Sequence, residues 1–338
     1  MPSYRSLYVE ASAAATTVGR SLIDQFADRP VVEVNSYHEV FSRPSASFQA
    51  QKRAPSLIAA VASPPYLYEA PSRVCARPGA RPGARPDELP VMYNDQLRNC
   101  VYNCDYCFLQ GMHPCGHTLV FVNSEDYHDA AADRAKSGPY WLSVSYLSDI
   151  LAFEPVLPLV RGWLDFAREH PKVTVEVRTK GEAPPLLRSE PAENFVFTWT
   201  LSPRLVAARH ERGCASPANR LTAIRAAIER GWRVRLAFDP VILVPGWKDA
   251  YGELIEETFT VVPAAAIEAA TYGVFRVGLD HANRMIAARS DTPVLHHPFV
   301  SAHGMLTYNE HEIEAIHRTV GSSLTSYLGA DRVAFVHA

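Results

Sequence analysis

Three cysteines lie close together in the first half of the chain, at Cys100, Cys104 and Cys107. A cubane of four irons and four sulfides normally takes one thiolate for each iron. A set of three thiolates leaves one iron without a protein ligand. The spacing therefore predicts a [4Fe-4S] cluster with one open iron site.

Two other interpretations use the same cysteines. Cys115, with His113 and His117, could complete a structural zinc site, since such sites usually collect four protein ligands. The sequence lacks the paired Cys-x-x-Cys knuckles of zinc sites. In addition, the aromatic residue directly after Cys107, Phe108, suits a cluster that lies beside an adenosyl group. A cysteine group without metal is the remaining interpretation. We favour the cluster over both.

An iron without a protein ligand can bind the amino and carboxylate groups of S-adenosylmethionine and pass an electron into its sulfonium. The product is a deoxyadenosyl radical that abstracts hydrogen from a substrate. The cysteine motif resembles that of the radical S-adenosylmethionine enzymes. By this resemblance the protein is an enzyme that also needs an external one-electron reductant of the flavodoxin or ferredoxin type.

The rest of the sequence resembles the spore photoproduct lyase family, whose members reverse a cross-linked thymine dimer in spore DNA. The resemblance covers nearly the whole chain. It is carried by the cysteine segment that ends at Gln110 and by short matches further along: Val122-Asn123, Ser148-Asp149, Arg178-Thr179-Lys180, Thr200, Asp239-Pro240-Val241 and Gly246-Trp247.

The resemblance implies roles for particular residues. The three cysteines ligate the cluster. The positions that contact S-adenosylmethionine are Tyr106, Ser148, Lys180 and Thr200. An ammonium at a strand end, such as that of Lys180, can hold the methionyl carboxylate. Asp239 stands where the family has a small residue, and its carboxylate could accept hydrogen bonds from a ribose or a substrate amine, or cap the turn before Pro240.

The chain departs from the family at the hydrogen donor. The family has a cysteine two residues before the serine of Ser148-Asp149, and a tyrosine directly after the last cluster cysteine. Tyr146 and Phe108 stand at these positions. Phenylalanine has no O-H to give, so the family relay cannot operate unchanged. Tyr146 and Cys115 are the candidate hydrogen donors, although for Cys115 we favour a plain loop cysteine; we expect Cys214 to be structural.

The stretch from Thr292 to Tyr308 argues against duplex DNA as the substrate. Where the family carries a basic, aromatic-rich stretch that engages DNA, this stretch has histidines and neither Lys nor Arg. DNA affinity depends mainly on fixed positive charge that neutralises phosphates. Histidine is mostly neutral at cytoplasmic pH. We therefore expect a small-molecule or nucleoside-like substrate.

Composition agrees with this expectation. Lys and Arg number 33 against 36 for Asp and Glu, so the protein has no overall basic field. Six cysteines, three of them clustered, suit a reducing compartment and a metal site better than a disulfide framework. The N-terminus lacks an apolar signal core, and no apolar run reaches the length of a membrane span. These features predict a cytoplasmic protein without a membrane segment.

The elements that must position the site alternate between strand and helix. The apolar runs predict strands at 140–146, 173–179, 195–201, 234–238 and 274–279. Amphipathic stretches predict helices at 126–136, 155–169, 219–230 and 250–258. A helix near 309–327 and a strand at 332–336 should close one side. Such alternation predicts an α/β fold, a partial (β/α)6 barrel with the cysteine loop after its first strand and the chemistry at the carboxyl ends of its strands.

We divide the chain into three parts. Residues 1–90 form an N-terminal extension, with a helix at 12–26 capped by Ser12, a strand at 31–34 and an Arg/Pro/Gly linker at 76–86. Residues 91–285 form the barrel and residues 286–338 a C-terminal cap. A biosynthetic radical enzyme is the favoured function. A DNA-repair lyase with a rearranged hydrogen donor and a non-catalytic metal-binding protein are the alternatives.

Overall fold

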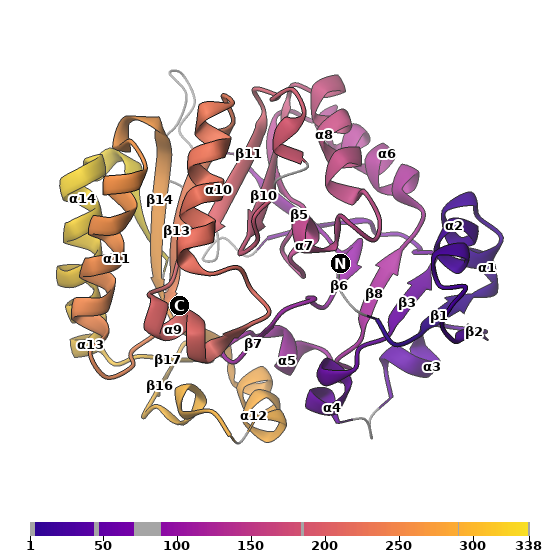
Figure 1. Ribbon diagram of the computed structural model, residues 1–338, viewed down its shortest axis with the longest axis horizontal. Coiled ribbons are helices and arrows are strands. Elements are labelled where there is room, and N and C mark those ends of the chain that lie inside the picture. The colour runs from indigo at the N-terminus through magenta and orange to yellow at the C-terminus, as the bar shows by residue number, and fades with distance from the viewer. Residues whose placement is uncertain (1–3, 44–46, 71–88, 184–185, 290, 337–338) are drawn as a thin grey trace.

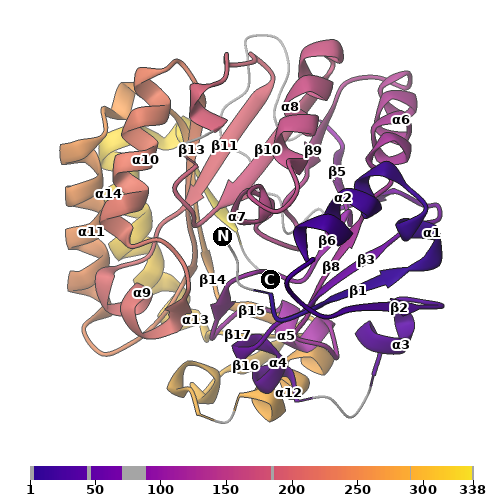
Figure 2. The same ribbon diagram turned by 45° about the vertical axis from the view of Figure 1, so that its right-hand side comes forward.

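The computed structural model describes residues 4–43, 47–70, 89–183, 186–289 and 291–336. Two sheets organise these residues (Figure 1). A large curved sheet carries most of the chain, and a smaller sheet built mainly from N-terminal strands lies beside it (Figure 2). The linker predicted at 76–86 lies outside the described residues.

Six parallel strands form the body of the large sheet and follow one another in chain order. They are β5 (Val91–Asn94), β9 (Tyr140–Ser143), β10 (Val173–Thr179), β11 (Phe195–Thr200), β13 (Arg233–Val241) and β14 (Ile267–Val274). Every residue of β11 is buried, as expected for a parallel strand covered on both faces. Two edge strands complete the sheet: antiparallel β4 (Leu67–Glu69) and parallel β18 (Val333–Val336).

Helices α6 (Ser124–Ala135), α8 (Leu159–Glu169), α10 (Pro217–Glu229) and α11 (Trp247–Val261) cover the outer face of this sheet (Figure 1). Two short helices, α7 (Ile150–Phe153) and α9 (Arg204–His210), follow β9 and β11 in the chain. Helix α10 begins where Ser216 accepts a hydrogen bond from the Asn219 N–H, with Pro217 at the first helical position. Among the described residues the edge strands β4 and β18 are not paired with each other. The predicted partial (β/α)6 barrel is confirmed.

The smaller sheet joins the N-terminal part of the chain to the segment after the cysteines. Its order is β2-β1-β3-β8-β6. The strands are β1 (Leu7–Glu10), β2 (Val31–Val34), β3 (Leu57–Ala60), β6 (Leu97–Arg98) and β8 (Thr118–Phe121). A boundary at residue 90 therefore crosses this sheet. The three-part division stays a prediction. The N-terminal strands are nevertheless in one sheet with β6 and β8, so the N-terminal part is not a separate extension from the cysteine region.

The predicted N-terminal helix with a Ser12 cap is wrong. Two helices occupy this stretch, α1 (Ala11–Ala14) and α2 (Thr17–Gln25). The Thr16 hydroxyl accepts a hydrogen bond from the Gly19 N–H at 2.9 Å and so begins α2, whereas Ser12 donates to the Glu10 carboxylate. Two further short helices, α3 (His38–Phe41) and α4 (Phe48–Arg53), follow. The strand predicted at 31–34 is confirmed as β2.

The strand predicted at 274–279 is also misplaced. The sixth barrel strand is β14, which ends at Val274 where the predicted strand begins. Its alanine-rich sequence does not resemble a typical strand, although β14 is paired with a neighbouring strand on both sides. Residues Arg276–Gly278 form β15 instead, in a small antiparallel sheet with β16 (Val300–Ala302) and β17 (Met305–Thr307).

The C-terminal part packs along one side of the large sheet and against the segment that follows the cysteines. Its helices are α12 (Leu279–Ala288), α13 (Glu310–Ile316) and α14 (Ser322–Leu328), with a π-helical turn at His317–Gly321 between the last two. The final helix and strand are thus confirmed, with the strand present as β18. Within the described residues, each helix falls short of the length and apolar character needed to cross a bilayer.

Candidate active site

The three cysteines lie in a loop between β6 and the short helix α5 (Leu109–Met112). Each has a free thiol, and Cys104 is buried while Cys100 and Cys107 are half-buried. Cys104 belongs to β7 (Asn103–Cys104), which pairs antiparallel with β12 (Glu211–Arg212). This pairing fixes the middle cysteine against a segment more than a hundred residues further along the chain.

Asn99 shapes the start of this loop. Its backbone φ is 68°, a left-handed conformation that asparagine adopts more readily than most residues. Its side-chain amide donates to the carbonyls of Cys115 and His117 at 2.8 and 2.9 Å, and its side-chain oxygen accepts from the Cys100 N–H at 3.0 Å. The Ser148 hydroxyl donates to the Asn99 carbonyl at 2.9 Å. Ser148 therefore meets the cysteine loop directly.

The N-terminal part of the chain supports the loop from the other side. The Lys52 ammonium donates to the Cys100 carbonyl. The Gln49 amide donates to the Gln110 side chain at 2.8 Å, while its oxygen accepts from Asn103 at 3.1 Å. Helix α4 thus holds the loop that carries the cysteines.

The donor set suits a cubane cluster. Burial raises the pKa of Cys100 to about 12 and that of Cys107 to about 11, so these thiols release protons only on binding a metal. The hydrogen bond from Cys214 and the charge of Lys180 lower the pKa of Cys104. Within the described residues no three His, Cys, Asp or Glu side chains surround a single metal ion. This result argues against a mononuclear site such as zinc. It does not bear on a cubane, in which each thiolate binds a different iron.

A buried charged network lies beside Cys104. The Lys180 ammonium is 3.8 Å from the Cys104 sulfur, 2.5 Å from the Tyr106 hydroxyl and 3.0 Å from the Glu211 carboxylate. Glu211 also accepts hydrogen bonds from the Tyr106 hydroxyl, from the fully buried Arg220 and, at 2.8 Å, from the Ser202 hydroxyl. A single carboxylate thus organises the polar wall of the site.

The network fixes the charges of its members. Burial disfavours the ammonium of Lys180, but Cys104 and Glu211 outweigh this and raise its pKa well above the usual value. Burial likewise disfavours the Glu211 carboxylate, but Lys180 and Arg220 hold its pKa far below the usual value. Burial and the Glu211 charge raise the pKa of Tyr106. The site therefore presents a permanent cation next to a neutral phenol.

An aromatic stack adjoins the cysteine loop at Phe108. The ring of Tyr146 stacks on Tyr93, with centroids 4.3 Å apart, and Tyr93 stacks on Tyr68 at 5.3 Å. Phe108, next to Cys107, lies 6.2 Å from the Tyr146 ring. All four rings are half-buried. We call Tyr68, Tyr93, Tyr146 and Phe108 the aromatic stack.

A sequence model described as Spore photoproduct lyase matches residues 95–295, more than half of the chain. The chain belongs to the spore photoproduct lyase family. Members of this family are radical S-adenosylmethionine enzymes. The chain is accordingly an enzyme of this type, and its cofactors are a [4Fe-4S] cluster and S-adenosylmethionine.

Solved spore photoproduct lyase structures share the whole fold. A cysteine-to-serine mutant aligns at a TM-score of 0.78 and 17% identity, over 99% of both chains. The lyase complexed with dinucleoside spore photoproduct gives the same values. A double mutant with bound AdoMet and dinucleoside spore photoproduct aligns at 0.77 and 17%, over 98% of both chains. A search of curated proteins finds no match.

The structure brings several of the residues predicted from the family resemblance together near the cysteine loop. Tyr106 and Lys180 lie beside Cys104, and Ser148 meets the cysteine loop. Thr200 ends β11, and its carbonyl accepts a hydrogen bond from Arg220 at 3.0 Å. Their contacts with S-adenosylmethionine stay predictions.

Asp239 and Cys115 lie in settings that the sequence did not suggest. The Asp239 carboxylate pairs with Arg276 at 2.7 Å and lies 3.7 Å from Arg178. Cys115 is fully buried in the core and its sulfur accepts a hydrogen bond from the His117 N–H at 3.4 Å. Burial raises its pKa to about 11. A substrate contact for Asp239 and a hydrogen-donor role for Cys115 stay predictions.

Sequence reasoning missed Glu211 and Arg220, and gave Cys214 no part in the site. No motif marks the first two, because a two-residue strand pairing brings Glu211 to Cys104 from far along the chain. The Cys214 sulfur lies 3.5 Å from that of Cys104. A glycine before Cys214, which permits a tight turn, was the available signal.

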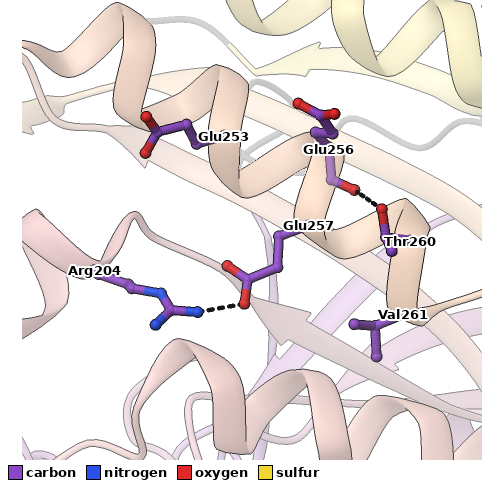
Figure 3. Close-up of a pocket in the computed structure, with 6 residues that line it drawn as sticks. All are labelled: Arg204, Glu253, Glu256, Glu257, Thr260 and Val261. Carbon is purple, nitrogen blue, oxygen red and sulfur yellow. Dashed lines mark hydrogen bonds and ion pairs between the residues drawn. The ribbon is translucent and has the colours of Figure 1, made fainter.

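A separate surface hollow lies between α9 and α11. Figure 3 shows its lining, in which Arg204 forms an ion pair with Glu257 at 2.5 Å. The Arg204 side chain is 70% exposed. The residues that line this hollow include neither a cysteine nor a member of the aromatic stack.

Proposed function

We propose that this enzyme abstracts hydrogen from a nucleoside-like or other small planar substrate, and that it acts in a biosynthetic pathway of the cytoplasm. The observation that carries the proposal is the aromatic stack beside the cysteine loop. Aromatic rings next to a reactive centre suit a flat heterocycle, because base–aromatic stacking contributes about 1–3 kcal/mol per base.

The charged network supports the assignment of the cofactor side. Lys180 is the permanent cation that would hold the methionyl carboxylate of S-adenosylmethionine. Glu211 and Tyr106 fix where the ammonium stands, and Ser148, Thr200 and Asp239 would complete the cofactor contacts. When bound, the cluster supplies the electron, delivered by a flavodoxin or ferredoxin type of reductant, that cleaves the sulfonium to a deoxyadenosyl radical.

The substrate side supports a change from the family reaction. Tyr146 stands where the family has its donor cysteine, and the Tyr146 ring is stacked on Tyr93. Phe108 has no hydroxyl with which to relay a hydrogen atom. A tyrosine fixed in a stack offers a surface to a planar substrate, so we assign Tyr146 to substrate contact and, as a proposal, to hydrogen donation.

The C-terminal hairpin β16–β17 supports a small substrate. Its aromatic residues pack inward: Phe299 stacks on Phe275 at 4.8 Å and on Tyr308 at 5.4 Å. His297 pairs with Glu312 at 2.8 Å, so its ring serves the protein's own packing. The stretch from Thr292 to Tyr308 has no Lys or Arg to meet phosphates. Duplex DNA thus lacks an anchor on this hairpin.

Repair of thymine photoproducts with a rearranged donor, Tyr146 or Cys115, is the second candidate. Family membership and the match to lyase structures that hold dinucleoside spore photoproduct favour it. The two candidates differ in their products. Repair converts the photoproduct into thymine units, whereas the first candidate reaction yields an altered nucleoside-like or other small planar compound.

One assay separates the candidates. Reconstituted, anaerobically reduced protein is incubated with S-adenosylmethionine and either dinucleoside spore photoproduct or a panel of deuterated nucleosides. We expect deuterium from a nucleoside to appear in 5′-deoxyadenosine, with little thymine released from the photoproduct. Stoichiometric or better repair of the photoproduct would overturn the proposal and establish the second candidate.

A further inference from the structure

Cys214 reaches the cysteine loop through a tight turn. The Cys214 N–H donates to the Glu211 carbonyl at 3.2 Å, which closes a four-residue turn. Gly213, the third residue of this turn, has φ of 86°, a value that favours glycine. Glu211 is the strand partner of Cys104. The turn therefore folds the Cys214 thiol back onto Cys104, and the two sulfurs lie 3.5 Å apart.

The segment after the turn is anchored as well. The Ala215 N–H donates to the Lys180 carbonyl at 3.1 Å, and the Ala215 carbonyl accepts from Arg220 at 2.9 Å. Both partners belong to the buried network beside Cys104. Cys214 is thus held in place by the same residues that hold the cofactor side of the site.

The separation of the two sulfurs indicates a neighbour of a ligand rather than a fourth ligand. Thiolates bound to different irons of one cubane do not touch, whereas these two sulfurs are within hydrogen-bonding distance. A thiol is a weak donor and a thiolate accepts hydrogen bonds. Hydrogen bonds to the sulfurs of an iron–sulfur cluster are among the factors that set its reduction potential.

We propose that the Cys214 thiol donates a hydrogen bond to the Cys104 thiolate when Cys104 ligates the cluster, and that this bond raises the reduction potential of the cluster. Cys214 is a positioning residue in this role. The inference rests on the cluster and is independent of which substrate the enzyme takes. Its tests need no substrate, so their failure is distinguishable from failure of the proposed function.

The first test measures the contact in cluster-free protein. Oxidised glutathione is added, and disulfides are mapped by peptide mass spectrometry. We expect a Cys104–Cys214 disulfide, formed as the two thiols lose two protons and two electrons and one glutathione disulfide becomes two glutathione thiols. Closing the gap to about 2.05 Å needs only a small movement. Cys115, which is buried elsewhere in the core, should stay a thiol. Absence of the Cys104–Cys214 disulfide would overturn the inference.

The second test measures the midpoint potential of the loaded protein by redox titration with electron paramagnetic resonance. Cys214→Ala should shift the potential to more negative values, because it removes the donor. Cys214→Ser keeps a donor, so its potential should stay near that of the unaltered protein. Cys115→Ala is the matched control and should leave the potential unchanged.

Two results of this titration would contradict the inference. One is a Cys214→Ala potential equal to that of the unaltered protein. The other is loss of iron from Cys214→Ser, which would make Cys214 a ligand instead of a donor. The serine variant decides the matter if the alanine variant does not assemble a cluster: full iron content with a potential near that of the unaltered protein supports the hydrogen bond.

Discussion

The proposed cofactor side and the proposed substrate side of the site are built from different kinds of residue. Lys180, Glu211 and Arg220 on the cofactor side are charged, buried and paired with one another. The aromatic stack on the substrate side is half-buried and is held by ring contacts such as that of Tyr93 with Tyr146. The first side suits a cofactor that the whole family uses, whereas the second suits a substrate particular to this chain.

The two sides also differ in how freely they can change. A buried ion pair is costly to break, because the remaining partner is left as an uncompensated charge. A ring in a half-buried stack can be exchanged at a smaller cost. We therefore expect membership of the family to constrain the proposed cofactor side more tightly than the proposed substrate side.

The largest effect is expected at the cluster ligands. Cys104→Ala removes one of three thiolates, so iron and sulfide content after reconstitution should fall to background and cleavage of S-adenosylmethionine should become undetectable. Cys115→Ala, the control, should retain full iron and sulfide. A Cys104→Ala protein that still carries a cubane would contradict the assignment of Cys104 as a ligand.

Replacement of Glu211 should weaken the cofactor side as a unit. Glu211→Gln leaves Lys180 and Arg220 as buried cations without their carboxylate, a loss of about 3–5 kcal/mol in the free energy of unfolding. Urea unfolding followed by circular dichroism, on cluster-free protein, measures it.

The exposed pair of Arg204 and Glu257 provides the matched control for this measurement (Figure 3). Glu257→Gln removes one charge from a solvated ion pair, which should cost about 0–1 kcal/mol. Equal losses for Glu211→Gln and Glu257→Gln would show that the buried network does not stabilise the fold more than a surface pair does.

On the substrate side, Tyr146 separates stacking from hydrogen donation. Tyr146→Ala should weaken binding of a nucleoside by about 1–3 kcal/mol, since one stacking surface is lost. Tyr146→Phe keeps the ring and should bind as the unaltered protein does, while turnover falls if the hydroxyl gives hydrogen. Calorimetric binding and a turnover assay check the two effects. Equal binding by the alanine and unaltered proteins would remove the aromatic stack from substrate recognition.

Much of the fold was predictable from the sequence because its signals are local. Strands β10 and β11 were found to within one residue, since each is an apolar run bounded by polar or turn residues. Strand β14 was missed because its Glu-Ala-Ala sequence has little strand character until β13 and β18 flank it. Pairing, not propensity, makes it a strand.

The site divides in the same way. The three cysteines and Lys180 belong to short motifs and could be named from the sequence. Glu211 could not, because a carboxylate becomes part of the site only when β12 pairs with β7 across the fold. The partner of Asp239, Arg276, is likewise set by the hairpin sheet rather than by any motif. Long-range pairing is what a single sequence conceals.

The smallest expected effect concerns His117, behind the cysteine loop. Its Nδ1 accepts a hydrogen bond from the Ser56 N–H at 3.0 Å, which requires the neutral ring. Burial lowers its pKa from 6.5 to about 4. Below pH 6.5 the unfolded chain binds a proton that the folded chain refuses, so the stability that His117 contributes above that pH is lost progressively as the pH falls toward 4.

His117→Asn tests this account, because the asparagine Oδ1 can take the place of Nδ1 as acceptor without titrating. At pH 7.5 the variant should be about as stable as the unaltered protein, which is the internal control. At pH 5 it should be more stable by roughly 1 kcal/mol, an amount reduced for solvent screening of a half-buried ring. Urea unfolding at the two pH values measures the difference. Because His113 stays in both proteins, with burial lowering its pKa to about 3, some acid sensitivity should persist in the variant. Parallel losses of stability in the two proteins would show that the loop is held by backbone contacts alone and that the protonation of His117 has no part in it.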